Sequence, residues 1–251
     1  MTTDRPPPPH EDSRAVLELR DVEASYGPYR ALFGVTFSVP EGAAVALVGS
    51  NGAGKSTVAR VISGLVRARA GSIRFAGHDI TRWPAWRIAR TGIAHAPEGR
   101  SVFASLSVQE NLLLAARALG GPDCADAVDR ALATFGHLAD HRHQLAGTLS
   151  GGEQRMLSLA KVLVVRKRLL VVDELSFGLS PAVVDEVFDA LRTIHAAGTS
   201  LLVIEQHVDR ALSVADRAVV LVRGRVAAEG TVADVEPAIT QLLPARHRWT
   251  A

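Results

Sequence analysis

The feature that most constrains this chain is a glycine-rich segment at residues 49–57, which reads GSNGAGKST. The preceding residues 43–48 are apolar and partly β-branched, as expected of a buried parallel strand. Val58, Ile62 and Leu65 then recur at helical spacing, which predicts a helix to about Leu65. Glycines let backbone amides converge on phosphate oxygens at a helix N-terminus, where the dipole favours anions. This context predicts a nucleoside triphosphate site, rather than a glycine-rich turn that happens to precede a lysine.

Two side chains of this phosphate loop have distinct expected roles. Lys55 would place a positive charge on the outer phosphates, and the Ser56 hydroxyl would be a ligand for Mg²⁺. The candidate nucleotide-binding residues of the loop are Gly49, Ser50, Asn51, Gly52, Ala53, Gly54, Lys55, Ser56 and Thr57.

Composition limits the alternatives. A chain of 251 residues with 47% hydrophobic content can form one domain, or one domain with an inserted lobe. Apolar runs such as those at residues 43–48, 169–172 and 201–204 are far shorter than the roughly 20 residues of a membrane-spanning helix. No signal peptide is expected from the charged, proline-rich start, and the single Cys124 favours a reducing cytoplasm over a disulfide framework. A net charge of +2, without basic runs interleaved with aromatics, does not predict a nucleic-acid partner.

The sequence pattern divides the chain into a tail and one folded domain. Residues 1–14 form a polar tail with four consecutive prolines, which we expect to be disordered, extended and mobile. The domain, residues 15–251, should begin with an alternating edge strand at residues 16–19 and stay rich in β-structure to residue 48. Further strands are predicted at residues 72–75, 93–96, 169–172, 201–204 and 218–222, and helices at residues 84–91 and 183–197.

From residue 107 the strand pattern gives way to helices. Ser107 and Glu110 match a capping box at the start of a helix. Apolar residues follow on one face at Leu112, Ala115, Ala116 and Leu119. The sequence therefore predicts an α/β core formed by residues 15–97 and 166–251, interrupted by a helical subdomain at about residues 98–165.

Two carboxylates follow the apolar strand predicted at residues 169–172. Because the carboxyl ends of parallel strands share one edge of a sheet, Asp173 and Glu174 should lie beside the phosphate loop. Asp173 can hold Mg²⁺ directly or through water, and Glu174 is placed to polarise an attacking water molecule. The alternative is a strand that simply meets a solvated turn, and the upstream phosphate loop argues against it.

A second helix start suited to anions lies at residues 149–155, which read LSGGEQR. Ser150 should cap this helix, and Gly151 and Gly152 leave its first amides bare. Together with the phosphate loop and the carboxylate pair, the segment resembles the signature motif of ATP-binding cassette (ABC) ATPases. The resemblance covers about residues 16–243. It implies a P-loop NTPase (RecA-like) α/β fold with a mostly parallel sheet, an N-terminal antiparallel β part and an inserted helical subdomain, and it implies ATP and Mg²⁺ as cofactors.

Members of that family pair head to tail. The resemblance implies that the signature residues act in trans, on the γ-phosphate held by the phosphate loop of a second subunit. These residues are Ser150, Gly151, Gly152 and Glu153. Residues 176–181 match the loop that crosses the dimer interface, and residues 216–221, with Gly224 and Arg225, look like the family's terminal hairpin.

Three further positions gain a role from the resemblance. Tyr26 matches the aromatic residue that stacks on adenine, although it also reads as a strand-end tyrosine. His207 matches the histidine that contacts the γ-phosphate, and Glu98 stands where many members carry a glutamine whose amide oxygen approaches Mg²⁺. The implied catalytic residues are thus Glu174 and His207, and the implied metal ligands are Ser56, Asp173 and Glu98.

Within the family, the chain looks most like the ATPases that serve branched-chain amino-acid import, the LivF type. The likeness is carried by residues 97–103 (PEGRSVF), 107–112 (SVQENL) and 178–181 (GLSP). Urea-transport relatives tend to show glutamine in place of Glu98. Leu175 departs from the usual proline and Ser180 from a common aspartate, but neither departure removes a catalytic group.

The expected protein is an ATP-hydrolysing subunit of an ABC importer for branched-chain or other hydrophobic amino acids. Its implied partners are ATP, a second ABC ATPase subunit in a hetero- or homodimer, membrane permease subunits and, indirectly, a solute-binding protein; it would act at the cytoplasmic face of the inner membrane. The alternatives are the ATPase of a urea or amide importer and a soluble ABC ATPase acting on DNA or the ribosome, which usually carries coiled-coil insertions or two cassettes. A non-hydrolytic binding module is disfavoured because Lys55, Asp173 and Glu174 are all present.

Overall fold

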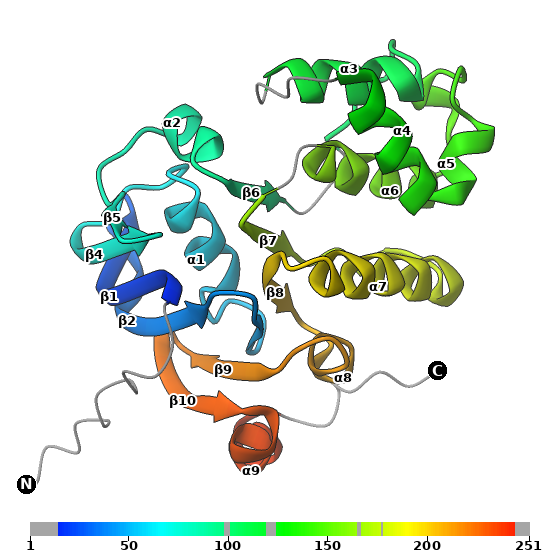
Figure 1. Ribbon diagram of the computed structural model, residues 1–251. Coiled ribbons are helices and arrows are strands. Elements are labelled where there is room, and N and C mark those ends of the chain that lie inside the picture. Colours follow the sequence, from blue (N-terminus) through cyan, green and yellow to red (C-terminus); the bar gives the residue numbers. More distant parts are fainter. Residues whose placement is uncertain (1–14, 98–100, 119–123, 165–166, 177, 244–251) are drawn as a thin grey trace, which may run out of the picture.

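Two β-sheets with helices around them form the molecule (Figure 1). The computed structural model describes residues 15–97, 101–118, 124–164, 167–176 and 178–243. The smaller sheet is antiparallel, in the order β2 (Tyr29–Pro40), β1 (Ala15–Tyr26), β4 (Ala70–Phe75) and β5 (His78–Asp79). The larger sheet has the order β10 (Arg225–Thr231), β9 (Arg217–Val222), β3 (Ala44–Val48), β8 (Ser200–Glu205), β7 (Leu169–Asp173) and β6 (Ile93–Ala96).

The larger sheet is parallel except at one edge. Strands β6, β7, β8, β3 and β9 pair in parallel, and β10 closes the edge as an antiparallel hairpin with β9. Because parallel strands bring their carboxyl ends to one edge, the segments that follow β3, β7 and β8 gather there. The predicted α/β class, the antiparallel N-terminal part and the terminal hairpin are confirmed.

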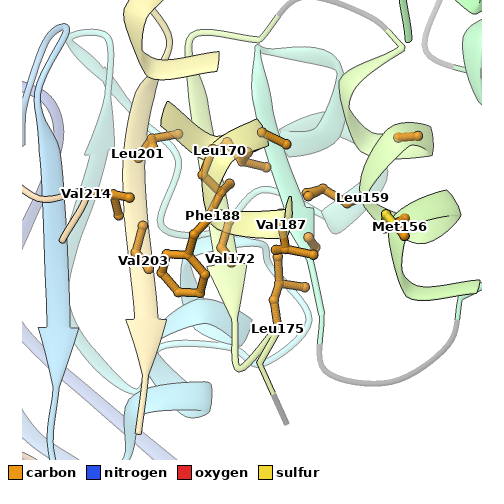
Figure 2. Packing of buried hydrophobic residues seen from close by; sticks show 14 of the residues in the cluster. Met156, Leu159, Leu170, Val172, Leu175, Val187, Phe188, Leu201, Val203 and Val214 are labelled. Carbon is orange, nitrogen blue, oxygen red and sulfur yellow. The ribbon is translucent and has the colours of Figure 1, made fainter. Parts of the chain in front are cut away.

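Successive side chains of the central strands point to opposite faces of the sheet and so belong to two hydrophobic cores. On β3, Ala44, Ala46 and Val48 face one core, while Val45 and Leu47 face the other. The first, here called the helical core, also contains buried residues of α6 and α7, and Figure 2 shows how they pack against β7 and β8. The second, the sheet core, joins the larger sheet to β1, β2, β4 and helix α1. Both faces of the central strands are therefore buried, as continuous apolar runs require.

The helices divide into two groups. Helices α1 (Lys55–Ile62), α2 (Ala85–Arg90), α7 (Pro181–Ala196), α8 (Val208–Leu212) and α9 (Val232–Leu242) are interspersed with the strands. A second group lies between β6 and β7 and extends away from the sheets in Figure 1. It consists of α3 (Val108–Ala118), α4 (Cys124–Thr134), α5 (Gly136–Asp140), a 3₁₀ turn (Ala146–Thr148) and α6 (Gly151–Leu163).

The start of the chain differs from the prediction. Leu17 and Leu19 are buried as the alternation indicated, but β1 is not an edge strand, because it pairs with both β2 and β4. Alternating polarity identifies which face of a strand is buried and says nothing about whether both of its backbone edges are paired.

Helix boundaries also shift slightly. Helix α1 ends at Ile62, three residues before the predicted end at Leu65, because Gly64 adopts a φ of 70° that a right-handed helix cannot continue. Helix α2 starts at Ala85, with Pro84 at its N-cap. The capping box of α3 is confirmed, since the Ser107 amide donates to Glu110 Oε2 and the Glu110 amide to Ser107 Oγ.

Some predictions concern residues that the structure does not describe. The proline-rich tail, Glu98 and Leu119 all lie outside the described residues. In the described part of the chain, no helix combines the length and apolarity needed to span a bilayer.

Candidate functional site

The phosphate loop connects β3 to α1, as the sequence predicted. A Cβ atom on Gly49 would lie 2.4 Å from the Leu221 carbonyl oxygen, so a side chain there would collide with β9. Gly54 is the N-cap of α1 with a φ of 104°, a conformation that other residues rarely adopt. The two glycines therefore permit a tight turn that ends where helix α1 begins. This is the arrangement in which backbone amides bind phosphate.

The lysine of this loop is buried beside the second predicted motif. Lys55 is 3% exposed, and its Nζ donates to the carbonyl oxygens of Gly49 at 3.1 Å and Ser50 at 3.4 Å. The same nitrogen lies 3.4 Å from Glu174 Oε1. The structure thus brings the candidate phosphate-binding cation and the candidate base together, although they are far apart in sequence.

The two oxygen donors predicted to hold a metal also meet. Ser56 Oγ donates a hydrogen bond of 3.0 Å to Asp173 Oδ1, and Asp173 is 2% exposed at the end of β7. A hydroxyl and a carboxylate are hard oxygen ligands that suit Mg²⁺, which typically takes one or two carboxylates together with substrate phosphates. Among the described residues no three side chains of His, Cys, Asp or Glu converge as a metal site. The donor set therefore fits a metal shared with a nucleotide.

The strand order places His207 at the same edge. Strand β8 lies between β3 and β7, and His207 follows it at the N-cap of α8, two residues beyond Glu205. The segments after β3, β7 and β8 consequently carry Lys55, Glu174 and His207, respectively.

Tyr26 lies farther out, at the end of β1. Its side chain is 41% exposed, and its hydroxyl accepts a hydrogen bond of 3.3 Å from Arg60 Nη1 on α1. Helix α1 therefore connects the tyrosine to the phosphate loop. The exposed ring is available to stack on a planar ligand, which is what the predicted adenine contact requires.

The predicted signature helix α6 begins at Gly151, with Ser150 as its N-cap. The Glu153 amide donates to Ser150 Oγ at 3.3 Å, and the Ser150 amide donates to Glu153 Oε2 at 2.7 Å. Hydrogen bonds with the Ser150 side chain and backbone hold the pKa of the Glu153 carboxyl below its usual value. A Cβ atom on Gly152 would lie 3.1 Å from Val183, so the missing side chain lets this helix start approach α7. The capping role predicted for Ser150 is confirmed.

Two buried charged residues at the site were not assigned a role from the sequence. Arg155 on α6 is 5% exposed and hydrogen-bonds the carbonyl oxygens of Glu174 and Leu175. Glu205, 1% exposed at the end of β8, accepts hydrogen bonds from the amide and hydroxyl of Ser176. The available signal was a charge next to an apolar run: Glu205 directly follows residues 201–204, and Arg155 directly precedes Met156 and Leu157.

The electrostatics of Glu205 differ from those of an ordinary glutamate. Burial raises the pKa of its carboxyl to about 7, the hydrogen bonds from Ser176 oppose the rise, and the nearby charge of Glu174 adds to it. Three carboxyl-bearing residues, Asp173, Glu174 and Glu205, therefore stand at the carboxyl ends of the neighbouring strands β7 and β8, with Lys55 as a buried cation beside Glu174. Such a site is suited to a metal–phosphate complex, which supplies compensating charges of both signs.

Comparison with known proteins agrees with this geometry. The family model described as ABC transporter matches residues 32–176, more than half of the chain. The high-affinity branched-chain amino acid transport ATP-binding protein BraG of Pseudomonas aeruginosa is 38% identical over 216 residues, which cover 86% of this chain and 93% of BraG. The probable branched-chain amino acid transport ATP-binding protein LivF of Archaeoglobus fulgidus is 37% identical over 217 residues, covering 86% of this chain and 92% of the relative.

A solved structure shows the same fold. The crystal structure of an ATP-binding cassette of an ABC transporter in its ADP conformation superposes with a TM-score of 0.80 at 26% sequence identity, covering 91% of this chain and 97% of that one. Sequence, fold and site geometry agree. The chain belongs to the ABC transporter family and is one of its ATP-binding, ATP-hydrolysing subunits.

Proposed function

We propose that this chain is the ATP-hydrolysing subunit of an import system for branched-chain or other hydrophobic amino acids, with Glu174 as the general base. The observation that carries the catalytic part is the contact of 3.4 Å between Lys55 Nζ and Glu174 Oε1, beside the hydrogen-bonded pair of Ser56 and Asp173. A carboxylate this close to the phosphate-binding lysine is within reach of a water molecule that faces the terminal phosphate.

Binding of ATP would use the phosphate loop, Tyr26 and the pair of Ser56 and Asp173. The amides of residues 49–57 and the Lys55 ammonium would hold the phosphates, and Tyr26 would stack on the adenine. Ser56 and Asp173 would hold Mg²⁺, which neutralises charge on the β- and γ-phosphates when it is bound. Glu98, outside the described residues, would contribute to the same metal site.

Hydrolysis would then proceed by in-line attack of water. Glu174 accepts a proton from the water as its oxygen bonds to the γ-phosphorus, and the bond from that phosphorus to the bridging oxygen breaks with its electrons leaving on ADP. His207 would contact the γ-phosphate and steady the charge that spreads over its oxygens. The products are ADP, inorganic phosphate and the proton held by Glu174.

The proposed transport activity requires partner chains. The signature residues of one subunit, Ser150, Gly151, Gly152 and Glu153, would cap the γ-phosphate of a second ATPase subunit, so that two ATP molecules close the dimer and hydrolysis reopens it. Permease subunits in the inner membrane would carry the solute, delivered by a solute-binding protein. The chain would act at the cytoplasmic face of that membrane.

The catalytic assignment is tested by the rate of ATP hydrolysis. Glu174→Gln keeps the shape of the side chain and removes the base, so kcat should fall by about 10²- to 10⁴-fold. Glu236→Gln, an equivalent change on the exposed face of α9, serves as the control and should leave kcat unchanged. If Glu174→Gln hydrolyses ATP at the wild-type rate, Glu174 is not the base.

The transport assignment is tested by uptake. Deletion of the gene from its host should abolish high-affinity uptake of radiolabelled leucine, isoleucine and valine, and wild-type protein should restore it where Lys55→Ala does not. Loss of urea uptake instead would assign the chain to the alternative importer class. Unchanged uptake of all four solutes would overturn the import proposal.

A further inference from the structure

The backbone that carries Glu174 is held in an unusual conformation. Glu174 has a φ of 48°, in the left-handed region that residues other than glycine seldom occupy. Such a conformation is strained and persists only where surrounding contacts enforce it. The contacts that hold the turn of residues 174–176 therefore determine where the Glu174 carboxylate lies.

One set of these contacts comes from helix α6. Arg155 Nη2 donates a hydrogen bond of 2.8 Å to the Glu174 carbonyl oxygen, and Arg155 Nε donates one of 3.3 Å to the Leu175 carbonyl oxygen. The guanidinium is buried, so it would be costly to leave these donors without acceptors. A planar guanidinium that bonds two consecutive carbonyl groups also fixes their relative orientation.

The opposite side of the turn is held by strand β8. The Glu174 amide donates to the Ile204 carbonyl oxygen at 2.9 Å, while the Ser176 amide and hydroxyl donate to Glu205 at 3.0 and 2.7 Å. Between them, the Leu175 side chain is buried in the helical core with Val172 and Val187 (Figure 2). The usual proline is absent at Leu175, and the turn is restrained by packing and by hydrogen bonds.

We propose that Arg155 is a positioning residue for ATP hydrolysis, which holds the turn after β7 so that the Glu174 carboxylate faces Lys55. It would act through the backbone carbonyl groups of Glu174 and Leu175, to which it donates hydrogen bonds. The inference rests on the proposed role of Glu174 as the base. Because Arg155 belongs to the helix whose first residues are the signature motif, a movement of α6 would be transmitted to the catalytic turn of the same subunit.

The inference is tested by separating turnover from binding in two substitutions. Arg155→Met keeps a long side chain and deletes every donor, and kcat should fall by about 10- to 100-fold, the cost of displacing a catalytic group by about 1 Å. The ATP dissociation constant should change by less than about threefold, since Lys55 and the loop amides are untouched. Arg155→Lys retains the charge and one donor nitrogen, so it should recover part of the rate.

A matched control is available on the same helix. The Lys161 ammonium donates to the Ser101 carbonyl oxygen at 2.6 Å, away from residues 174–176, so Lys161→Met also deletes a cationic donor of α6 that bonds a backbone carbonyl. Its kcat should stay within about twofold of wild type. Circular dichroism and thermal unfolding should report folded protein for each variant, and Arg155→Lys carries the test if Arg155→Met does not fold.

A double substitution distinguishes this inference from the proposed role of Glu174. If Arg155 acts through Glu174, Arg155→Lys and Arg155→Met should slow the wild-type enzyme but add nothing in a Glu174→Gln background. A further fall in that background, or kcat at the wild-type level for both Arg155 variants while Glu174→Gln is slow, overturns the positioning role alone. Wild-type turnover by Glu174→Gln itself would instead remove the base assignment on which it rests.

Discussion

At the scale of single residues, ATP binding should depend on the buried lysine of the phosphate loop. Lys55 is 3% exposed, and its ammonium group contacts two loop carbonyl groups and Glu174. The phosphates of a bound triphosphate would contact the same ammonium group. Hydrogen bonds to charged groups contribute about 1.5 to 3 kcal/mol each, so Lys55→Ala should weaken ATP binding by at least about 10- to 100-fold. Isothermal titration calorimetry measures this directly.

The control for Lys55→Ala is Lys161→Ala, which removes a lysine from α6 and should leave the ATP affinity unchanged. Equal affinities of wild type and Lys55→Ala would contradict the assignment of residues 49–57 as the nucleotide site. A parallel loss in both variants would indicate a general effect of lost positive charge rather than a contact of Lys55 with phosphate.

Another residue of the larger sheet should make stability depend on pH. His95 lies on β6, and its Nε2 is buried without a hydrogen-bond partner among the described residues. Burial, helped by the positive charge of Arg60, lowers the pKa of His95 from 6.5 to about 4. The folded state thus binds fewer protons than the unfolded state between pH 4 and 6.5. The contribution of neutral His95 to the free energy of unfolding is therefore complete above pH 6.5 and is lost as the pH falls toward 4.

The expected size follows from the shift, because one pKa unit corresponds to about 1.4 kcal/mol and the full effect is about 3 kcal/mol. Urea unfolding of wild type and His95→Gln from pH 4 to 8 measures it as the difference between the two curves. The difference between wild type and Glu205→Gln should change with pH in the opposite direction. The raised pKa of Glu205 makes its contribution to the free energy of unfolding decline as the pH rises from about 4.5 to 7. A wild-type minus His95→Gln difference that stays flat across the range would contradict the prediction.

At the scale of secondary-structure elements, local rules predicted most of the fold. Buried parallel strands such as β3 and β8 are continuous apolar runs, and α3 and α6 begin with capping boxes that can be read over four residues. These signals are local, so sequence alone reveals them. The pairing of β1 on both of its edges was missed because it depends on β4, which lies about 50 residues away in the sequence.

Two helices offer a matched test of what a capping box does here. Ser150 and Glu153 cap α6, and Thr231 and Asp234 cap α9 in the same way. Ser150→Ala and Thr231→Ala should each lower the free energy of unfolding by about 1 kcal/mol. Only Ser150→Ala should also lower ATP hydrolysis, because α6 starts at the proposed contact with the partner's nucleotide.

Thermal unfolding and steady-state hydrolysis of these two variants give the answer. Equal loss of activity in both would mean that stability, and not the position of Ser150, limits turnover. Normal activity in both would argue against a role of the α6 start at the γ-phosphate.

At the scale of the whole molecule, the catalytic edge is assembled from segments distant in sequence. Two contacts of this edge could be predicted from the sequence: that of Lys55 with Glu174 and that of Ser56 with Asp173. Both follow because the carboxyl ends of parallel strands converge. The hydrogen bonds of Arg155 and Glu205 could not, since they join residues about 20 and 29 positions apart and depend on how α6 and β8 pack against the turn. No local periodicity encodes such contacts.

The same edge is incomplete within a single subunit under the proposed mechanism. Lys55, Glu174 and His207 follow strands of the larger sheet, whereas the bare start of α6 belongs to the helices between β6 and β7. Under that mechanism the start of α6 would serve the nucleotide of a neighbouring subunit, so that two chains would complete each nucleotide site. Assembly should then depend on ATP and should persist when hydrolysis is blocked.

Glu174→Gln provides that block. The substitution removes the base and one negative charge near the γ-phosphate, so ATP binding should survive and tighten, because an anion no longer repels the phosphates. With its second ATPase subunit present, the variant should accumulate as an ATP-bound closed dimer, visible as earlier elution in gel filtration with Mg-ATP than without it. Adding Ser150→Arg should abolish the dimer but leave ATP bound, because the arginine blocks the helix start that reaches the partner's nucleotide. A Glu174→Gln protein that binds Mg-ATP yet elutes as a monomer would contradict the proposed ATP-driven closure.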